Sequence, residues 1–355
     1  MHPKQPLRTT TRMIARTTTR TTTRTTTRTL VATPARRCVV LAALALGASS
    51  GAQAQSNVTL YGLIDLSAGS FQSPGGVAKK GIDSGNMSTS YWGLKGSEDL
   101  GDGLQANFVL ESFMRNDTGA SGRFDGDTYW ARTSSVGLSN RFGAINLGRN
   151  TTSLFVQTLL FNAFGDSFGF SPSIRHYFTS DTTTGDTGWN DSIQYSSPSM
   201  AGFSFTAHGA LGEGNGGRNT GLSALYFGGP LALGASWQVV KRGATVADTT
   251  TWQLAGSYDF KGVKLYAQYG EVANDSSLNH YAISGMGGEL NIGAGKLMAQ
   301  YSQVSPDVGA NRKTASLGYD YFLSKRTDPY AVYMQDRLSG LANGNNYAAG
   351  IRHRF

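Results

Sequence analysis

Cysteine is nearly absent from this chain of 355 residues, since Cys38 is the only one. It precedes a short apolar run, from Val39 to Leu46, so we expect neither a disulfide framework nor a lipoprotein signal. The run is also too short to cross a bilayer as a helix.

Acidic residues are absent from residues 1–54, which hold nine of the 31 basic residues. The rest of the chain therefore has 22 basic residues against all 23 acidic ones, which gives a formal charge of −1 instead of the +8 of the whole chain. Because the basic character belongs to these first residues, the main argument for a nucleic-acid partner is lost, and none is expected.

Residues 1–54 have the organisation of a leader. Thr-Thr-Thr-Arg recurs up to Arg28, and a repeat of this composition cannot bury a core. Arg36-Arg37, the apolar run and Ala52-Gln53-Ala54 follow in the order of a secretory signal peptide and its cleavage site. We therefore expect residues 1–54 to be a Thr/Arg-rich extension plus a cleaved signal peptide. Residues 55–355, beginning at Gln55, are expected to form a single β-barrel domain.

From residue 57 onward, apolar and polar residues alternate in short runs. A period of two predicts strands with one apolar and one polar face. An even number of strands of roughly ten residues is what an antiparallel outer-membrane barrel requires. Sixteen segments fit: 57–69, 88–98, 103–115, 127–139, 142–149, 189–197, 202–211, 219–227, 231–240, 251–259, 263–271, 280–290, 296–304, 312–323, 330–337 and 346–355.

The connections between these segments alternate between short turns and longer polar loops, as they do in membrane barrels. The loop 150–188 is the longest, and it holds an aromatic cluster and the segment Phe-Gly-Asp-Ser-Phe-Gly. A loop of this length in a compact domain is usually functional. The sequence thus predicts an all-β protein: a 16-stranded antiparallel transmembrane β-barrel with its third external loop folded into the lumen.

A soluble β-sandwich is the structural alternative, but no segment would form its second, covering sheet. Tyrosines near the predicted strand ends also favour a membrane, because such residues form girdles at its interfaces. They are Tyr61, Tyr258, Tyr269, Tyr301, Tyr319 and Tyr347.

The domain resembles the trimeric general porins, most closely those of beta-proteobacteria. The resemblance begins at Ser56–Gly62 and continues through Trp92–Gly101 and Leu110-Glu111-Ser112. Further matching motifs are Val136-Gly137-Leu138, Leu147-Gly148-Arg149, Tyr195–Pro198, Leu323–Thr327 and Gly350–Phe355. It covers essentially all of residues 55–355.

This resemblance implies a homotrimer in the Gram-negative outer membrane, in contact with its lipid and lipopolysaccharide, that passes small polar solutes and ions without a cofactor. It also implies a C-terminal signal for the outer-membrane insertion machinery. Tyr347, Ile351 and Phe355 share one face of the last strand and would carry that signal.

Family members set arginines of the barrel wall against acids of the inserted loop. Arg132 and Arg149 match two wall arginines, although a period of two points Arg149 outward. Alternation with Leu94 and Leu110 turns Lys95 and Glu111 inward, and Asp65 is a further candidate. Charges facing lipid would be costly, which favours a place at the constriction for Arg132 and Lys95. Glu111 and Asp65 could equally be ordinary solvated charges of a wide pore.

The sequence departs from the family in the same region. Tyr91 stands where many relatives have arginine, and Trp189 or Gly188 lies near another wall position. Asp166 is the only carboxylate in residues 150–180, while Arg175 could move into the same space. A weakly charged constriction would discriminate less between ions, or could stack sugars and aromatic solutes. In the segment 127–139, an inward Arg132 would leave a small, polar outer face, which suits a neighbouring subunit.

No enzyme and no metal site is expected. Gly47–Gly51 matches a nucleophile elbow but lies in the leader, and Gly212–Gly217 matches a dinucleotide pattern but opens no helix. A general diffusion porin is the interpretation favoured here. The alternatives are a substrate-preferring porin for a sugar or an aromatic solute, a barrel enzyme such as an outer-membrane phospholipase, and an adhesin.

Overall fold

The computed structural model describes residues 57–179, 187–212, 217–241 and 248–355. The chain divides into two units, residues 1–53 and 54–355, and all described residues belong to the second. The expected signal peptide, its cleavage site and the Thr/Arg repeat lie outside the described residues.

Strands dominate the described part of the chain, with two short helices between β7 and β8. None of the described helices is long and apolar enough to cross a membrane. The elements are β1 (Asn57–Phe71), β2 (Lys79–Ser84), β3 (Tyr91–Gly101), β4 (Leu104–Arg115), β5 (Ala120–Ser121), β6 (Thr133–Asn140), β7 (Gly143–Thr151), α2 (Ser153–Leu160), α3 (Pro172–Phe178), β8 (Gly188–Ser196), β9 (Phe203–Ala210), β10 (Asn219–Gly228), β11 (Leu231–Val240), β12 (Thr249–Asp259), β13 (Val263–Asn274), β14 (Asn279–Ile292), β15 (Gly295–Pro306), β16 (Arg312–Tyr321), β17 (Thr327–Leu338) and β18 (Gly344–Arg354).

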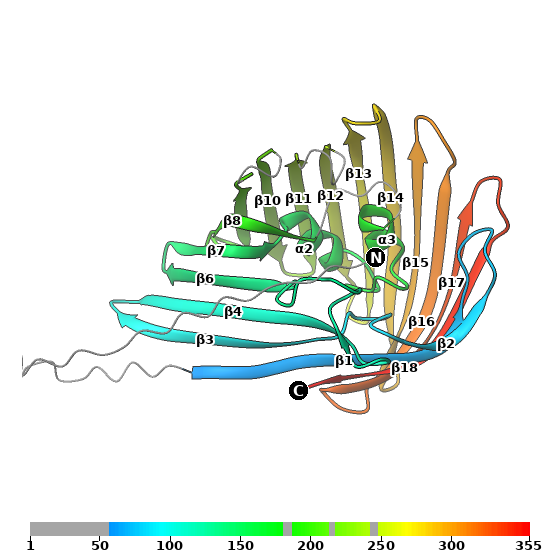
Figure 1. Cartoon of the computed structure of the whole chain (residues 1–355), viewed down its shortest axis with the longest axis horizontal. Helices are drawn as coiled ribbons and strands as arrows, with labels where there is room; N and C mark the ends of the chain where they lie inside the picture. Colours follow the sequence, from blue (N-terminus) through cyan, green and yellow to red (C-terminus); the bar gives the residue numbers. More distant parts are fainter. Residues whose placement is uncertain (1–56, 180–186, 213–216, 242–247) are drawn as a thin grey trace, which may run out of the picture. The chain divides into compact units, whose positions relative to one another are not determined.

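The strands form a closed antiparallel barrel (Figure 1). β1 completes it by pairing with β18 through Leu63–Ser70 and with β3 through Asn57–Leu63. Within the described residues, sixteen long strands match the sixteen predicted segments, and β2 and β5 are two short additions at the long-loop end. The predicted barrel is therefore confirmed.

The two faces of the strands differ as the alternation predicts. On β12, for example, the side chain of Leu254 is 55 % exposed on the outside, whereas the neighbouring Gln253 is fully buried on the inside. Closure satisfies the backbone hydrogen bonds of every long strand, and this is the condition for a sheet to cross lipid. Of the tyrosines expected in the girdle, Tyr258 and Tyr347 are exposed, but Tyr61 turns inward to Glu111.

The connection between β7 and β8 forms α2 and α3, which the sequence pattern did not predict. The side chains of Thr152 and Ser171 accept the N-cap hydrogen bonds, and Pro172 occupies the first helical position, where it needs no donor. Helices of eight and seven residues are too short to be stable alone. Contacts with the barrel wall must therefore stabilise them.

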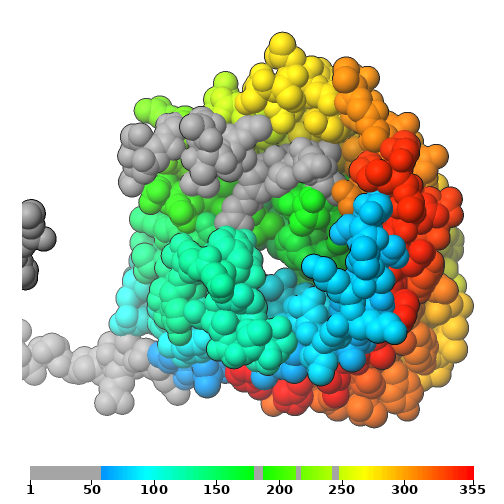
Figure 2. Space-filling view, turned by 45° about the vertical axis from the view of Figure 1, so that its right-hand side comes forward, coloured from blue at the N-terminus to red at the C-terminus, as the bar shows by residue number. Residues whose placement is uncertain are grey.

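Those contacts lie on the polar inner face of the barrel wall between β10 and β16. α2 contacts β10, β11 and β12, and α3 contacts β14, β15 and β16. Gln157 of α2 donates to the Oε1 atom of Gln253 over 3.0 Å. The side chain of Gln300 donates to the hydroxyl of Ser173 of α3 over 2.6 Å. Figure 2 shows this segment, in green, within the opening of the barrel.

The strand predicted at 127–139 begins only at Thr133, and its two faces are the reverse of those expected. Val136 and Leu138 are exposed on the outside, while Gly137 is buried inside. The prediction of a small, polar outer face on this strand was wrong. Residues before Thr133 leave the sheet, so the alternation does not extend back to Arg132.

Candidate functional site

A compact group of charged and aromatic side chains lies on the inner wall formed by β1, β3, β4 and the residues before β6. The guanidinium of Arg132 forms an ion pair of 2.5 Å with the carboxylate of Glu111 and lies 4.0 Å from the ring centroid of Tyr91. The hydroxyl of Tyr61 donates to the same carboxylate over 2.7 Å. Arg132 reaches this group although its position precedes the strand, because its backbone N–H still bonds to the carbonyl of Glu111.

Lys95 of β3 extends the same group. Its ammonium lies 4.7 Å from the ring centroid of Tyr61, which is packed edge-on against the ring of Tyr91. Lys95 is exposed, and the structure shows no ion pair for it among the described residues. A cation over an aromatic face is held in place while its charge still acts on the adjoining water.

Asp65 of β1 is fully buried and has a structural environment. Its carboxylate accepts hydrogen bonds of 2.7 Å from the backbone N–H groups of Met87 and Ser88 and from the hydroxyl of Tyr330. This carboxylate therefore fixes the chain between β2 and β3. It does not meet the passage directly.

The tip of the β7–β8 connection meets that chain at Ser88. The hydroxyl of Ser88 donates to the carboxylate of Asp166 over 3.0 Å, and Arg352 of β18 lies 3.1 Å from the same hydroxyl. Ser88 therefore links Asp166, the only acidic residue of 150–180 in the inserted β7–β8 connection, to Arg352 of the barrel wall.

Arg352 and Arg354 are site residues that the sequence reasoning did not select. Both pair with Asp328, at 2.6 and 2.5 Å, and Arg352 also pairs with Asp320. The signal that could have found them is simple: they alternate with the outward Ile351, His353 and Phe355 on the last strand. Together with Lys296 and Lys325 they line a cavity of about 610 Å³.

Arg175 of α3 holds the inserted segment against the wall. Its guanidinium bonds to the carbonyls of Phe168 and Gly169 and to the carboxylate of Asp336, which also pairs with Arg312 at 2.5 Å. Next to it, both ring nitrogens of His176 face hydroxyls, those of Ser302 at 2.9 Å and Thr314 at 2.8 Å. Burial, with the nearby charge of Arg312, lowers the pKa of His176 to about 3.

Two predicted site residues have other surroundings. Arg149 pairs with Ser134 in the sheet register, at a β-bulge between Gly148 and Asn150, and its guanidinium bonds to the carbonyls of Ala131 and Gly188 and to the side chain of Asn190. Trp189 is only 1 % exposed and packs 4.6 Å from the ring of His208. It cannot stack a solute that passes through the barrel.

The residues expected to form the assembly signal share the outer face of β18. Tyr347, Ile351 and Phe355 are all exposed there. The backbone of Phe355 exchanges two hydrogen bonds with Gly62, so the end of the chain is paired with β1.

A closed barrel with an apolar outside and a polar inside that carries charged side chains defines a membrane channel for hydrophilic solutes. Within the described residues, no group of three or more His, Cys, Asp or Glu side chains could hold a metal ion. The family model of the Gram-negative porins matches residues 40–341, and the chain belongs to this family.

Known porins support the same assignment. Outer membrane porin protein 32 of Delftia acidovorans is 31 % identical over 88 % of this chain and 94 % of its own length. An outer-membrane porin of Bordetella pertussis is 29 % identical over 90 % and 100 %. The solved structure of an anion-selective porin from Comamonas acidovorans has a TM-score of 0.73 at 27 % identity and covers 85 % of this chain and 100 % of that one. The chain is thus a porin of the Gram-negative outer membrane, a passive channel for small hydrophilic solutes and ions.

Proposed function

We propose that this porin is a general diffusion pore that discriminates only weakly between anions and cations. The observation that carries the proposal is the pairing of charges along the described inner wall. Arg132 pairs with Glu111, Arg352 and Arg354 with Asp328, and Arg312 with Asp336. An ion in the passage meets the small field of each pair, which falls off faster with distance than the field of a single charge.

The narrowest section of the proposed pore lies between the tip of the β7–β8 connection and the group around Tyr91. The hydrogen bond of Ser88 to Asp166 supports this location, because it joins the tip to the wall on the side of β1 and β3. Lys95 and Asp166, which form no ion pair within the part of the chain that the structure describes, have opposite signs and contribute opposing fields. The anion-selective porin of Comamonas acidovorans shares the fold, but its selectivity does not follow for this chain.

Planar lipid bilayers in a potassium chloride gradient test the proposal. We expect a permeability ratio between the two ions within about threefold at 0.1 M salt. The ratio should move towards one as the salt concentration rises, because the Debye length shortens. A ratio above about tenfold for either ion at 0.1 M would overturn weak discrimination. Such a ratio would not contradict the channel itself, because the conductance tests channel formation separately.

We also propose a homotrimer that the insertion machinery recognises at its C-terminal strand. The outward side chains of Tyr347, Ile351 and Phe355 at the end of the chain support the second part, since they are available to a partner before the barrel closes. Gel migration without heating tests the trimer. A single band at the size of the monomer, under conditions in which the barrel is folded, would refute it.

A further inference from the structure

A second cavity lies at the long-loop end of the barrel, beyond the proposed constriction. It has a volume of about 500 Å³ and is bounded by the end of β4, the segments after β2 and β5, and the β7–β8 connection. Phe113 faces inward two residues beyond Glu111, so the cavity continues the same wall towards the outside. Its size is in the range of sites for small organic ligands.

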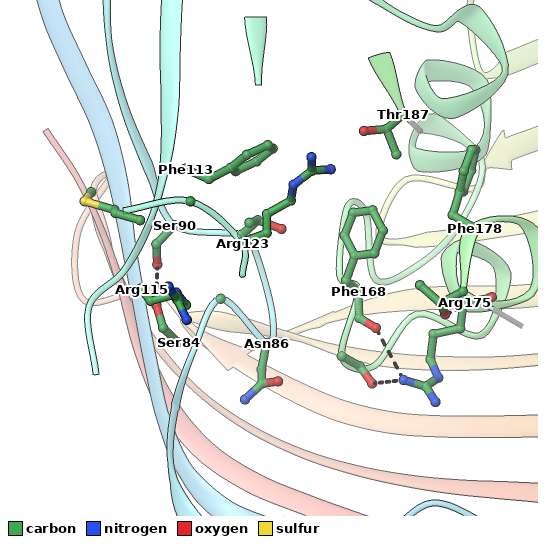
Figure 3. Close-up of a pocket in the computed structure, with 16 residues that line it drawn as sticks. Ser84, Asn86, Ser90, Phe113, Arg115, Arg123, Phe168, Arg175, Phe178 and Thr187 are labelled. Carbon is green, nitrogen blue, oxygen red and sulfur yellow. Dashed lines mark hydrogen bonds between the residues drawn. The ribbon is translucent and has the colours of Figure 1, made fainter. Parts of the chain in front are cut away.

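Aromatic rings form opposite sides of this cavity (Figure 3). On one side, the guanidinium of Arg123 lies 5.0 Å from the ring centroid of Phe113. On the other side, the ring of Phe168 stacks on Phe155 at 5.8 Å, and Phe155 meets Phe178 edge-on at 5.3 Å. Arg175 fixes the second side, because it bonds to the carbonyls of Phe168 and Gly169.

The charged side chains among the residues lining the cavity are all arginines: Arg115, Arg123 and Arg175. Arg115 pairs at 2.6 Å with Asp125, whose side chain is 94 % exposed. Exposed ion pairs of this kind contribute little, so a carboxylate in solution can compete with Asp125 for the same guanidinium. The hydroxyls of Ser84 and Ser90, 3.2 Å apart, add polar atoms beside it.

We propose that this cavity is a binding site for small aromatic carboxylates, with the ring between the two aromatic sides and the carboxylate on Arg115. A flat ring gains from stacking on phenylalanine and from the guanidinium of Arg123, and the carboxylate gains a charge-assisted hydrogen bond. An acetate ion lacks the ring, and a neutral aromatic alcohol lacks the charge. The inference rests on the proposed function, because the site lies on the path into the diffusion pore.

Benzoate, added to one side of bilayers that contain channels of one orientation, is the direct probe. From the long-loop side we expect a saturable decrease in chloride conductance with added current noise, at a half-saturating concentration well below that from the short-turn side. Acetate, benzyl alcohol and cyclohexanecarboxylate serve as matched solutes that lack the ring, the charge and the aromaticity. Equal effects of benzoate and cyclohexanecarboxylate, or equal effects from the two sides, would overturn the proposal.

Single substitutions test which side chains of the cavity bind benzoate. Phe168→Ala should raise the half-saturating benzoate concentration about fivefold, as expected for the loss of one aromatic contact. Arg115→Gln should raise it by a similar factor, whereas Arg218→Gln, on a different external loop, should leave it unchanged. Unchanged saturation in both site variants, with normal chloride conductance, would refute the site. The reversal potential in potassium chloride reports the weak ion discrimination separately, so either inference can fail while the other stands.

Discussion

Replacing Arg132 by glutamine should make the pore more permeable to cations, and replacing Glu111 by glutamine should have the opposite effect. The two side chains form one ion pair, but they face the passage unequally: the side chain of Arg132 is 30 % exposed and that of Glu111 is 8 %. We therefore expect the larger change for Arg132→Gln. Glutamine keeps a hydrogen-bonding side chain at each position, so the shape of the wall changes little.

The size of the effect follows from the charge removed. A unit charge about 5 Å from an ion in water contributes about 0.8 kcal/mol, which screening at 0.1 M salt reduces to about 0.5 kcal/mol. This changes cation and anion partition by about twofold each in opposite directions, and so the permeability ratio by about fivefold. At 1 M salt the Debye length is about 3 Å, and the ratio should change by less than about twofold.

Reversal potentials in salt gradients, measured at both salt concentrations, give these ratios. The double variant, in which both residues are glutamine, is the matched control: it removes the two charges together and should return the ratio close to that of the wild type. A single Arg132→Gln variant that shifts the ratio by less than about 1.5-fold at 0.1 M would refute the reasoning. So would a double variant that behaves like the single one.

Three further outcomes are expected. His176 stabilises α3 in its neutral form, and its pKa in the folded protein is about 3, below that of an unfolded chain. Its contribution to stability is thus present above about pH 6.5 and is lost as the pH falls towards 3. The resistance of the folded barrel to heating should therefore fall from pH 7 to pH 4. It should fall less in the variant His176→Gln, in which Arg175, Arg312 and Asp336 still face the site. Deleting Phe355 should reduce the yield of inserted barrel several-fold more than deleting Leu341 from an external loop, and equal yields on unheated gels would contradict the role of the last strand. Shortening the tip between Phe164 and Phe168 should raise single-channel conductance without loss of the trimer, and an unchanged conductance would place the constriction elsewhere.

The strands were predictable because lipid on one side and water on the other impose a period of two on every strand. The β7–β8 connection was predictable by its length, but α2 and α3 were not. Their sequences carry caps at Thr152 and Ser171, yet the helices depend on partners such as Gln253 and Gln300, which are distant in the sequence. Local patterns do not contain that information.

The site was predicted less completely, and the reasons differ from residue to residue. Arg132 reaches Glu111 and Tyr91 because β6 begins only at Thr133, the residue after it. Arg132 therefore does not follow the alternation of that strand, and the sequence pattern does not reveal where the strand begins. The burial of Trp189 depends on His208, from the next strand along the chain. Arg352 could have been predicted as a site residue, because the alternation that turns Phe355 outward turns Arg352 inward.

The inner wall divides into two regions with different chemistry. Where the inserted segment lies against β12 to β16, the contacts are mostly neutral: Gln157 with Gln253, Ser173 with Gln300, and His176 with two hydroxyls. Burying charges there would cost desolvation that an ion pair does not fully offset, whereas neutral amides and hydroxyls can hydrogen-bond to one another without that cost. At the edge of this neutral surface, Arg175 forms an ion pair with Asp336 of β17. The charged side chains that water reaches lie elsewhere on the wall: Lys95 of β3 is exposed, and Arg132, just before β6, and Arg354 of β18 are partly exposed. Most contacts that hold the segment are thereby separated from the charged side chains that act on permeating ions, so a charge variant such as Arg132→Gln can change selectivity without releasing the segment.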